Sequence, residues 1–253
     1  MTPRQFKKLQ AEKLKEQKVK PIQKVSNSFI DSALHKSNLA SLKTIYYLAT
    51  ILDKFDHSKS VDTLSIDLRQ MLKYTEMTAQ DIRNNLRAMQ ETSISFINEK
   101  QKTEEYISLV PRIEFLWGKN IVEIDLYSKI AKLIIDAVGQ YSFIDTKQLM
   151  KLQNKHSLRL LPVLFKLSQY SPNVAKRVSY ELEDLNDLFG TKYKRLVEID
   201  RKILASVKEE LDAESKLTFV YEIDFVNLGQ GRPKAHKITI DLVEQKNPQG
   251  KLF

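Results

Sequence analysis

The sequence predicts an α+β fold built from two tandem winged-helix domains, each a helix-turn-helix followed by a β-hairpin wing. The clearer copy occupies residues 155–243, which read as a helix, a short strand, an acidic helix, a long basic helix and two alternating strands joined by a basic loop at 229–237. A looser copy of this order fills the first half of the chain. Proteins use this order of elements to read DNA, and two copies suggest a protein that grips a long DNA site.

Length and composition agree with two small domains. With 253 residues, of which 42% are hydrophobic, the chain can bury one large core or two cores of about 100–120 residues each. The absence of cysteine excludes a disulfide scaffold and a zinc site built on thiolates, and it suits a reducing cytosol. No signal peptide opens the chain, and its most apolar run, 130–144, is interrupted by Lys132 and Asp136. We therefore expect a soluble, cytoplasmic protein.

The net charge of +9 is concentrated in an N-terminal tail, residues 1–24. This tail carries eight Lys or Arg residues against Glu12 and Glu16, a net +6 that leaves only +3 for the other 229 residues. It could be an arm that lies on DNA phosphates, or equally a solvated leader. For the rest of the chain, the placement of charge has to carry any argument about a nucleic-acid partner.

The first domain, expected over residues 25–140, contains a candidate base-reading helix. Apolar spacing predicts a core helix over 39–55, a strand over 63–66 and a helix over 67–74, after which Thr78 is expected to cap a helix running to about Glu91. One face of this last helix is apolar and the opposite face carries Gln80, Asn84 and Arg87, flanked by Arg83. Arg, Asn and Gln are the side chains that pair bidentately with guanine and adenine edges. An ordinary amphipathic helix with a solvated face remains the alternative.

A first wing is predicted after this helix. Residues 93–98 and 106–116 are apolar runs of β-forming residues around the polar tip 99–105, and they read as a hairpin. A strand at 121–124 and a helix at 126–138 follow. Gly139 and Gln140 then read as a helix stop and as the boundary of a second domain, 141–253.

The second domain carries the stronger DNA-reading pattern. A helix begins near Lys155 and includes Pro162, which is tolerated best near a helix start. A short acidic helix follows and ends at Gly190. The next helix is expected from Lys192 to about Ala213, with a buried stripe of Leu196, Ile199, Ile203, Val207 and Leu211. Its first half is basic, which suits a recognition helix, and the basic residues are Lys192, Lys194, Arg195, Arg201 and Lys202.

The final two strands predict the second wing. The apolar residues alternate inward on both strands: Leu217, Phe219, Tyr221, Ile223 and Phe225 on the first, and Ile238, Ile240 and Leu242 on the second. The loop between them carries Arg232, Lys234 and Lys237 and no acid. This favours contact with DNA over a solvated hairpin.

The motifs of the second half resemble a known family. Lys155-His-Ser-Leu-Arg159 before an apolar helix, then 180–190 (Tyr-Glu-Leu-Glu-Asp-Leu-Asn-Asp-Leu-Phe-Gly), then Tyr193-Lys194 and Arg201-Lys-Ile-Leu204, are similar to plasmid replication initiators of the Rep-3 type. The closing 216–222, Gly231-Arg-Pro-Lys234 and 238–242 match that family's final hairpin. The resemblance covers about 140–243 closely and 25–138 at the level of pattern. It implies a tandem winged-helix initiator of an iteron-containing plasmid.

The resemblance also implies partners and roles. Such initiators bind tandem direct repeats at an origin as monomers, help open the adjacent AT-rich DNA and bring in host replication proteins, including the replicative helicase. Many also dimerise through the first winged-helix domain and repress their own gene. Carried onto this chain, Lys194, Arg195, Arg201 and Lys202 are the candidate readers of the second domain, and Gln80, Asn84 and Arg87 are those of the first. The chain departs from the family pattern at Asp200, where a basic residue is common, and at Pro162.

An enzyme, a metal site and a cofactor are not expected. A rolling-circle initiator needs paired histidines and a nucleophilic tyrosine, but the four histidines, His35, His57, His156 and His236, show no His-x-His spacing. No phosphate-binding Gly-x-x-x-x-Gly-Lys-Ser/Thr motif occurs. The rival hypothesis within DNA binding is a winged-helix transcriptional regulator with no origin role. A protein–protein scaffold would leave the basic wing and the basic helix start unexplained.

Overall fold

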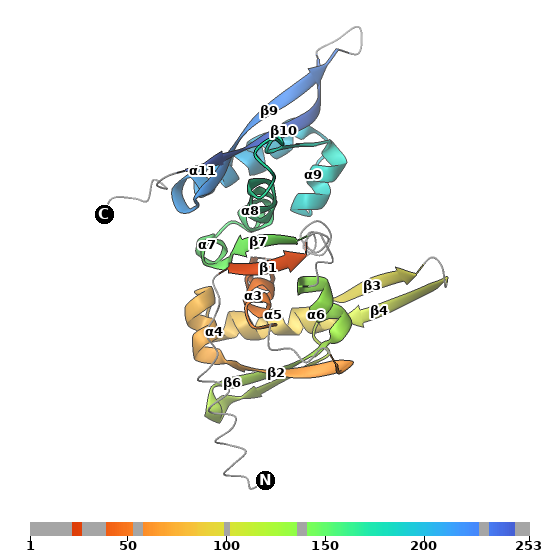
Figure 1. Ribbon diagram of the computed structural model, residues 1–253, viewed down its shortest axis with the longest axis vertical. Coiled ribbons are helices and arrows are strands. Elements are labelled where there is room, and N and C mark those ends of the chain that lie inside the picture. The colour runs from red at the N-terminus through yellow and green to blue at the C-terminus, as the bar shows by residue number, and fades with distance from the viewer. Residues whose placement is uncertain are drawn as a thin grey trace, which may run out of the picture. The chain divides into compact units, whose positions relative to one another are not determined.

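The structure, a computed structural model, describes residues 22–26, 39–52, 58–98, 102–135, 141–227 and 233–245. The chain divides into two units, one of Met1–Gln23 with Ala40–Ala137 and the other of Lys24–Leu39 with Val138–Phe253 (Figure 1). The segment Lys24–Leu39 thus groups with the second unit, whereas the sequence pattern placed it in the first domain. The N-terminal tail, apart from its end in β1, and the Gly139–Gln140 helix stop lie outside the described residues.

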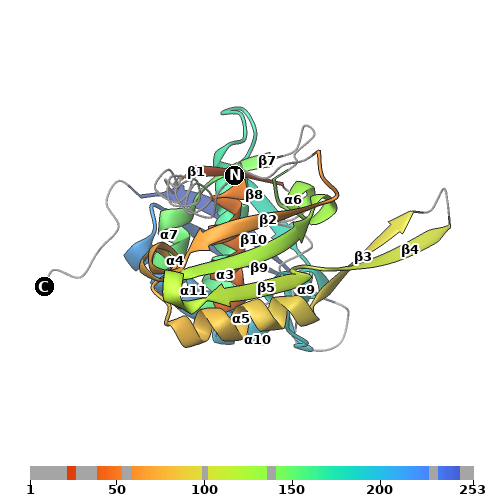
Figure 2. The same ribbon diagram turned by 90° about the horizontal axis from the view of Figure 1, so that it is seen from below.

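The first unit combines helices with two small antiparallel sheets. Its elements are α3 (Leu39–Ala49), β2 (Val61–Asp67), α4 (Leu68–Thr75), α5 (Ala79–Glu91), β3 (Ser93–Asn98), β4 (Thr103–Ser108), β5 (Arg112–Leu116), η2 (Trp117–Lys119), β6 (Ile121–Tyr127) and α6 (Ser128–Ile135). Helix α3 is buried along almost its whole length and forms the centre of the core. The sheets have the strand orders β2-β6-β5 and β3-β4, and Figure 2 shows the β3–β4 hairpin extending away from the larger sheet.

The predicted first hairpin is wrong in its second strand. Residues 106–116 do not form one strand: β4 pairs with β3, whereas β5 pairs with β6 in the other sheet, with Arg112 opposite Asp125. The break falls at Leu109 and Val110, which are buried, and at Pro111. Proline has no amide hydrogen for a ladder, and the two apolar side chains draw the backbone into the core, so one apolar run becomes two strands.

The helix starts of the first unit follow from local hydrogen bonds. Thr78 caps α5 as predicted: its Oγ1 accepts from the Asp81 amide at 3.1 Å, and its own amide donates to the Asp81 carboxylate at 3.1 Å. The hydrogen bonds from Thr78 hold the pKa of Asp81 below its usual range. Asp67 caps α4 in a similar way, accepting from the Arg69 amide at 2.8 Å. These caps fix where α5 begins, and therefore which of its residues face outward.

The second unit is organised around α8. Its elements are β1 (Ile22–Ser26), β7 (Tyr141–Asp145), α7 (Thr146–Lys151), α8 (Lys155–Ser168), β8 (Arg177–Tyr180), α9 (Leu182–Phe189), α10 (Leu196–Ile199), the π-helical turn η3 (Asp200–Leu204), α11 (Ala205–Glu214), β9 (Leu217–Val226) and β10 (Lys234–Glu244). Strand β1 pairs with β7, and β10 lies between β8 and β9 in an antiparallel sheet. Helix α8 packs against α9, α11 and both long strands. None of the helices described for the chain has the length and apolarity that a bilayer-spanning segment needs.

Pro162 lies inside α8 and not near its start. The helix begins at Lys155, capped by Asn154, whose Oδ1 accepts from the His156 amide at 2.9 Å. Proline therefore falls in the third turn and removes one hydrogen bond from the helix interior. Pro162 is buried, as are Leu161 and Val163 beside it. Packing of the proline ring in the core offsets part of the lost hydrogen bond.

The predicted basic helix is shorter at its start and is interrupted. It begins at Leu196 instead of Lys192, and the π-helical turn Asp200–Leu204 separates α10 from α11. Residues 192–195 form a turn before it. The predicted buried stripe is confirmed at all five positions, and Leu204 is buried in addition.

The inward pattern of the last strands holds only near the core. Leu217 and Phe219 are buried, whereas Phe225 is 57% exposed, so its predicted inward position is wrong. The reason is that β9 and β10 continue as a two-stranded arm beyond the helices, which cover the start of β9 and the middle of β10 (Figure 1).

We expect His156 to make folding pH-dependent. Its half-buried ring meets Phe189 of α9 edge-on at 5.4 Å, and its Nδ1 has no hydrogen-bond partner among the described residues. Burial, reinforced by the charges of Lys155 and Arg159, lowers the pKa of His156 from 6.5 to about 4. The unfolded chain therefore binds this proton more readily between these values. The contribution of neutral His156 to the free energy of unfolding is complete above pH 6.5. It falls by about 1–3 kcal/mol as the pH drops toward 4.

Urea unfolding of the wild type and of His156→Phe at pH 7, 6 and 5 would test this. The variant keeps the ring contact with Phe189 and has no titratable group. Its free energy of unfolding should fall less between pH 7 and 5 than that of the wild type. Equal falls in the two proteins would contradict the assignment.

Candidate nucleic-acid interface

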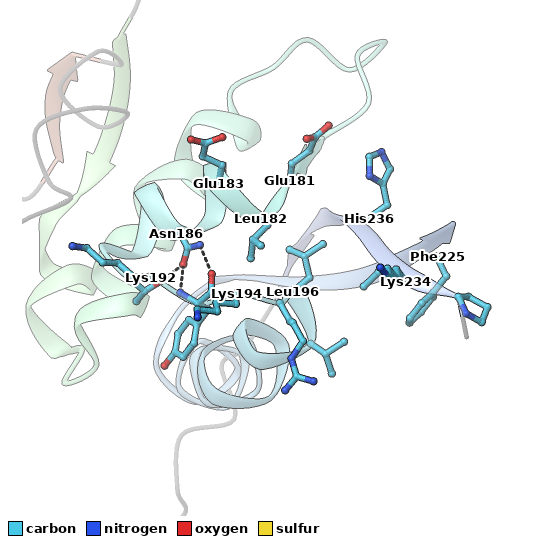
Figure 3. A pocket seen from close by; sticks show the side chains of 16 residues that line it. Glu181, Leu182, Glu183, Asn186, Lys192, Lys194, Leu196, Phe225, Lys234 and His236 are labelled. Atoms are coloured by element: carbon cyan, nitrogen blue, oxygen red, sulfur yellow. Dashed lines mark hydrogen bonds between the residues drawn. The ribbon is translucent and has the colours of Figure 1, made fainter. Parts of the chain in front are cut away.

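A groove of about 1020 Å³ opens between the start of α9, the turn 191–195, the first turn of α10 and the end of the wing strands nearest their loop (Figure 3). Its lining includes four of the eight basic residues predicted to contact DNA in the second domain, namely Lys192, Lys194, Arg195 and Lys234. The structure therefore brings together basic residues from the connection before α10 and basic residues from the wing. Glu181 and Glu183, which also line the groove, lie on the α9 side in Figure 3.

Asn186 holds the turn that carries the basic residues. Its Oδ1 accepts from Thr191 Oγ1 at 2.8 Å and from the Tyr193 amide at 2.8 Å, and its Nδ2 donates to the Tyr193 carbonyl at 2.9 Å. Gly190 ends α9 in the left-handed conformation, with φ of 60°, which glycine adopts without strain. One side chain of α9 thus fixes the first half of the short connection to α10.

The basic residues differ in how freely they project. Lys192, Lys194, Arg201 and Lys202 are exposed. Arg195 is also exposed, and its guanidinium lies 3.7 Å from Glu198. The ammonium of Lys202 lies 5.1 Å from the centre of the Tyr193 ring, a cation–π contact that connects the helix to the preceding turn. Lys192, Lys194 and Arg195 line the groove, whereas Arg201 and Lys202 lie outside its lining on the helical segment that follows.

Asp200, next to Arg201, is bonded to the wing. Its carboxylate accepts a hydrogen bond of 2.6 Å from the Tyr221 hydroxyl on β9. Burial and this hydrogen bond raise the pKa of Tyr221 to about 12, so the hydroxyl stays a donor at neutral pH. The departure from the family pattern at Asp200 therefore connects the helix to the wing, and it leaves Arg201 and Lys202 exposed.

The wing contributes less charge than its loop sequence suggests. Lys234 is exposed at the start of β10, but Lys237 forms an ion pair of 3.3 Å with Asp224 of β9. The loop itself has no acid, so this partner comes from the facing strand, next to the bulge in the β9–β10 pairing. Arg232 lies outside the described residues.

In the first unit, α5 presents the predicted polar face. Gln80, Asn84 and Arg87 are exposed, and Gln80 Nε2 donates to Asn84 Oδ1 at 2.9 Å. Arg83 instead turns toward the end of β5, where its guanidinium lies 4.5 Å from the centre of the Trp117 ring. That ring stacks on Phe115 at 4.9 Å. The aromatic pair therefore positions Arg83 at one side of the face.

Known proteins share this arrangement of elements. The model of a family described as "Initiator Replication protein, WH1" matches residues 22–165, more than half of the chain. The chain belongs to this family. The fold of the chain is similar to that of a solved Pi initiator protein in complex with iteron DNA, with a TM-score of 0.72 at 12% identity over 91% of this chain and 100% of the other. No curated protein sequence matches the chain. The predicted family and the α+β winged-helix fold are both confirmed.

Sequence reasoning missed several residues that shape this candidate interface. Asn186 lies four residues before Gly190, which ends the helix. An Asn at this position only weakly predicts a side chain that hydrogen-bonds to the following turn. Tyr193 entered only as part of the family resemblance and Tyr221 only as an inward-facing strand residue, because the partners that give them their roles lie on other elements. Within the described part of the chain, no group of three or more His, Asp or Glu residues could hold a metal ion. His35 and His57 lie outside that part.

Proposed function

We propose that the protein is a plasmid replication initiator that binds tandem direct repeats, iterons, at its origin as a monomer. The observation that carries this proposal is the duplicated arrangement, in which each unit presents a helix with exposed amide or basic side chains followed by a β-hairpin. Family membership and the likeness to an initiator solved with iteron DNA support it. Each unit would contact one turn of a repeat of about two turns.

In the second unit, α10 enters the major groove by its N-terminal end. Arg195 and Arg201 suit guanine edges, and Lys194 and Lys202 suit either bases or phosphates. Lys192 and Lys234 line the groove of the protein beside this end of α10, and they suit backbone phosphates of the DNA. Lys237, already paired with Asp224, contributes less, and Arg232 extends the charge of the wing loop.

In the first unit, α5 reads a second segment of the repeat. Gln80, Asn84 and Arg87 are spaced three or four residues apart and so share one face of the helix. Amide side chains suit adenine and Arg87 suits guanine. Arg83, held by Trp117 and Phe115, would contact the backbone beside them.

The later steps use binding energy and no catalytic group of this chain. The bound initiator helps open the adjacent AT-rich DNA and recruits host replication proteins, including the replicative helicase. As a dimer it represses its own gene. The protein acts as a DNA-binding protein and not as an enzyme.

The test is replication itself. A circular DNA without another origin would carry the gene and its flanking sequence, and footprinting would locate the bound sites. We expect tandem direct repeats of about two helical turns beside an AT-rich segment, and loss of replication when the repeats are deleted. A lone inverted repeat, protected but not needed for replication, would instead favour a transcriptional regulator.

We expect a monomer–dimer equilibrium in which only the monomer occupies a single repeat. Strand β5 is at the edge of the sheet β2-β6-β5, so a second copy can pair with it. Sedimentation velocity over a range of concentrations, with and without a duplex carrying one repeat, would measure this. Each duplex should bind one protein chain, and added duplex should dissociate the dimer. A tight dimer on every single-repeat duplex would exclude this model.

A further inference from the structure

Val197, in the first turn of α10, is an exposed apolar side chain in a basic groove. It is 47% exposed, whereas its helix neighbours Leu196 and Ile199 are 3% and 0% exposed. The core therefore does not require an apolar residue at this position. Valine is also a weak helix former, so helix propensity does not favour it.

The surroundings of Val197 define what can bind there. It lines the groove together with Lys194, Arg195 and Lys234, which form a cationic rim. Figure 3 places Lys194 and Lys234 near the α10 end of the groove and the carboxylates of Glu181 and Glu183 on the far side. A cationic rim around an apolar centre suits a polyanion that offers an apolar group. In the major groove of duplex DNA, that group is the 5-methyl of thymine.

We propose that Val197 recognises the methyl group of a thymine in the bound duplex. The side chain is short and stiff about its first torsion angle, so its two methyl groups keep a fixed position. Arg201 follows four residues later and suits a guanine on the same side of the helix. The inference rests on the proposed function, and it names the residue that selects thymine in the bound repeat.

The test begins with a randomised duplex pool, from which the protein itself selects the sequence of the repeat. Wild-type protein and Val197→Ala would each select from the pool. The selected wild-type duplex would then be synthesised with uracil in place of thymine, one position at a time. Uracil keeps every hydrogen-bonding group of thymine and removes only the methyl. At one position, uracil should weaken wild-type binding about fourfold, the ratio for one buried methyl group.

At that same position, Val197→Ala should bind the thymine and uracil duplexes equally and should have lost the preference for thymine in its own selection. Val220→Ala is the matched control, since Val220 is 49% exposed but lies on β9 outside the groove. It should retain the wild-type response to uracil. The thermal midpoints of both variants should match that of the wild type, because both side chains are exposed.

Three results would overturn the inference. One is an unchanged thymine preference in Val197→Ala, and another is a wild type insensitive to uracil at every position. The third is equal methyl sensitivity in wild type and variant. In each case, sequence-specific binding by the wild type would leave the proposed function standing. A wild type that selects no sequence at all would overturn both.

Discussion

Replacing Asn186 with Ala should lower the free energy of unfolding by about 2–4 kcal/mol, from three lost hydrogen bonds at about 0.5–1.5 kcal/mol each. The substitution leaves the Tyr193 amide and carbonyl, both bonded to Asn186 in the wild type, without these partners. It should also weaken duplex binding at least about tenfold, because the turn that carries the basic residues loses its fixed conformation. Urea unfolding followed by circular dichroism, and titration with a cognate duplex, would measure the two effects.

Thr191→Val provides a graded control. It keeps the size of the side chain and removes only the hydrogen bond from Thr191 Oγ1 to Asn186. It should cost about a third as much stability and leave binding nearly unchanged. If Asn186→Ala bound DNA as tightly as the wild type, the turn would not need this clamp.

Arg201→Ala should weaken binding to the cognate repeat by about 1–3 kcal/mol and have little effect on a scrambled duplex, since a bidentate contact to guanine is specific to sequence. Lys202→Ala should follow the same pattern if Lys202 reads a base. Its result also includes the lost contact with Tyr193, so Arg201 is the cleaner test. Titrations on both duplexes at several salt concentrations would separate base contacts from phosphate contacts.

Lys208→Ala is the matched control for charge. Lys208 lies further along the same helical segment, on α11, and is paired with Asp212 at 2.7 Å, so its loss should affect neither duplex. If Arg201→Ala weakened both duplexes equally, Arg201 would contact only phosphate. If it weakened neither, the exposed side of η3 would be solvated and the second unit would bind DNA through another surface.

The features that sequence predicted well are those set by local periodicity and capping. The five-residue buried stripe of α10, η3 and α11 follows from apolar spacing, and Thr78 follows from the capping preference of threonine. In both cases the decisive contacts lie within a few residues along the chain or on one face of a helix.

The features that sequence did not predict depend on partners distant in the chain. The ion pair between Lys237 and Asp224 requires the register of β9 and β10, including their bulge. The separation of β4 from β5 required knowing that β6 would pair with β5. The later start of the basic helix depends on Asn186, because the turn 191–195 bonds to a side chain of the preceding helix.

The π-helical turn η3 affects how α10 and α11 are rotated relative to each other about the helix axis. From Ile199 onward the buried residues recur every four positions, at Ile203, Val207 and Leu211. In a regular α-helix such a series drifts by about 40° per step, since each residue advances about 100°. The turn Asp200–Leu204, with its wider hydrogen-bonded rings, absorbs part of that drift. A residue deleted from this segment or inserted into it would therefore change the rotation of α10, the end that we propose faces DNA, relative to the buried stripe of α11 by up to about 100°. The length of the segment, more than its composition, sets that rotation.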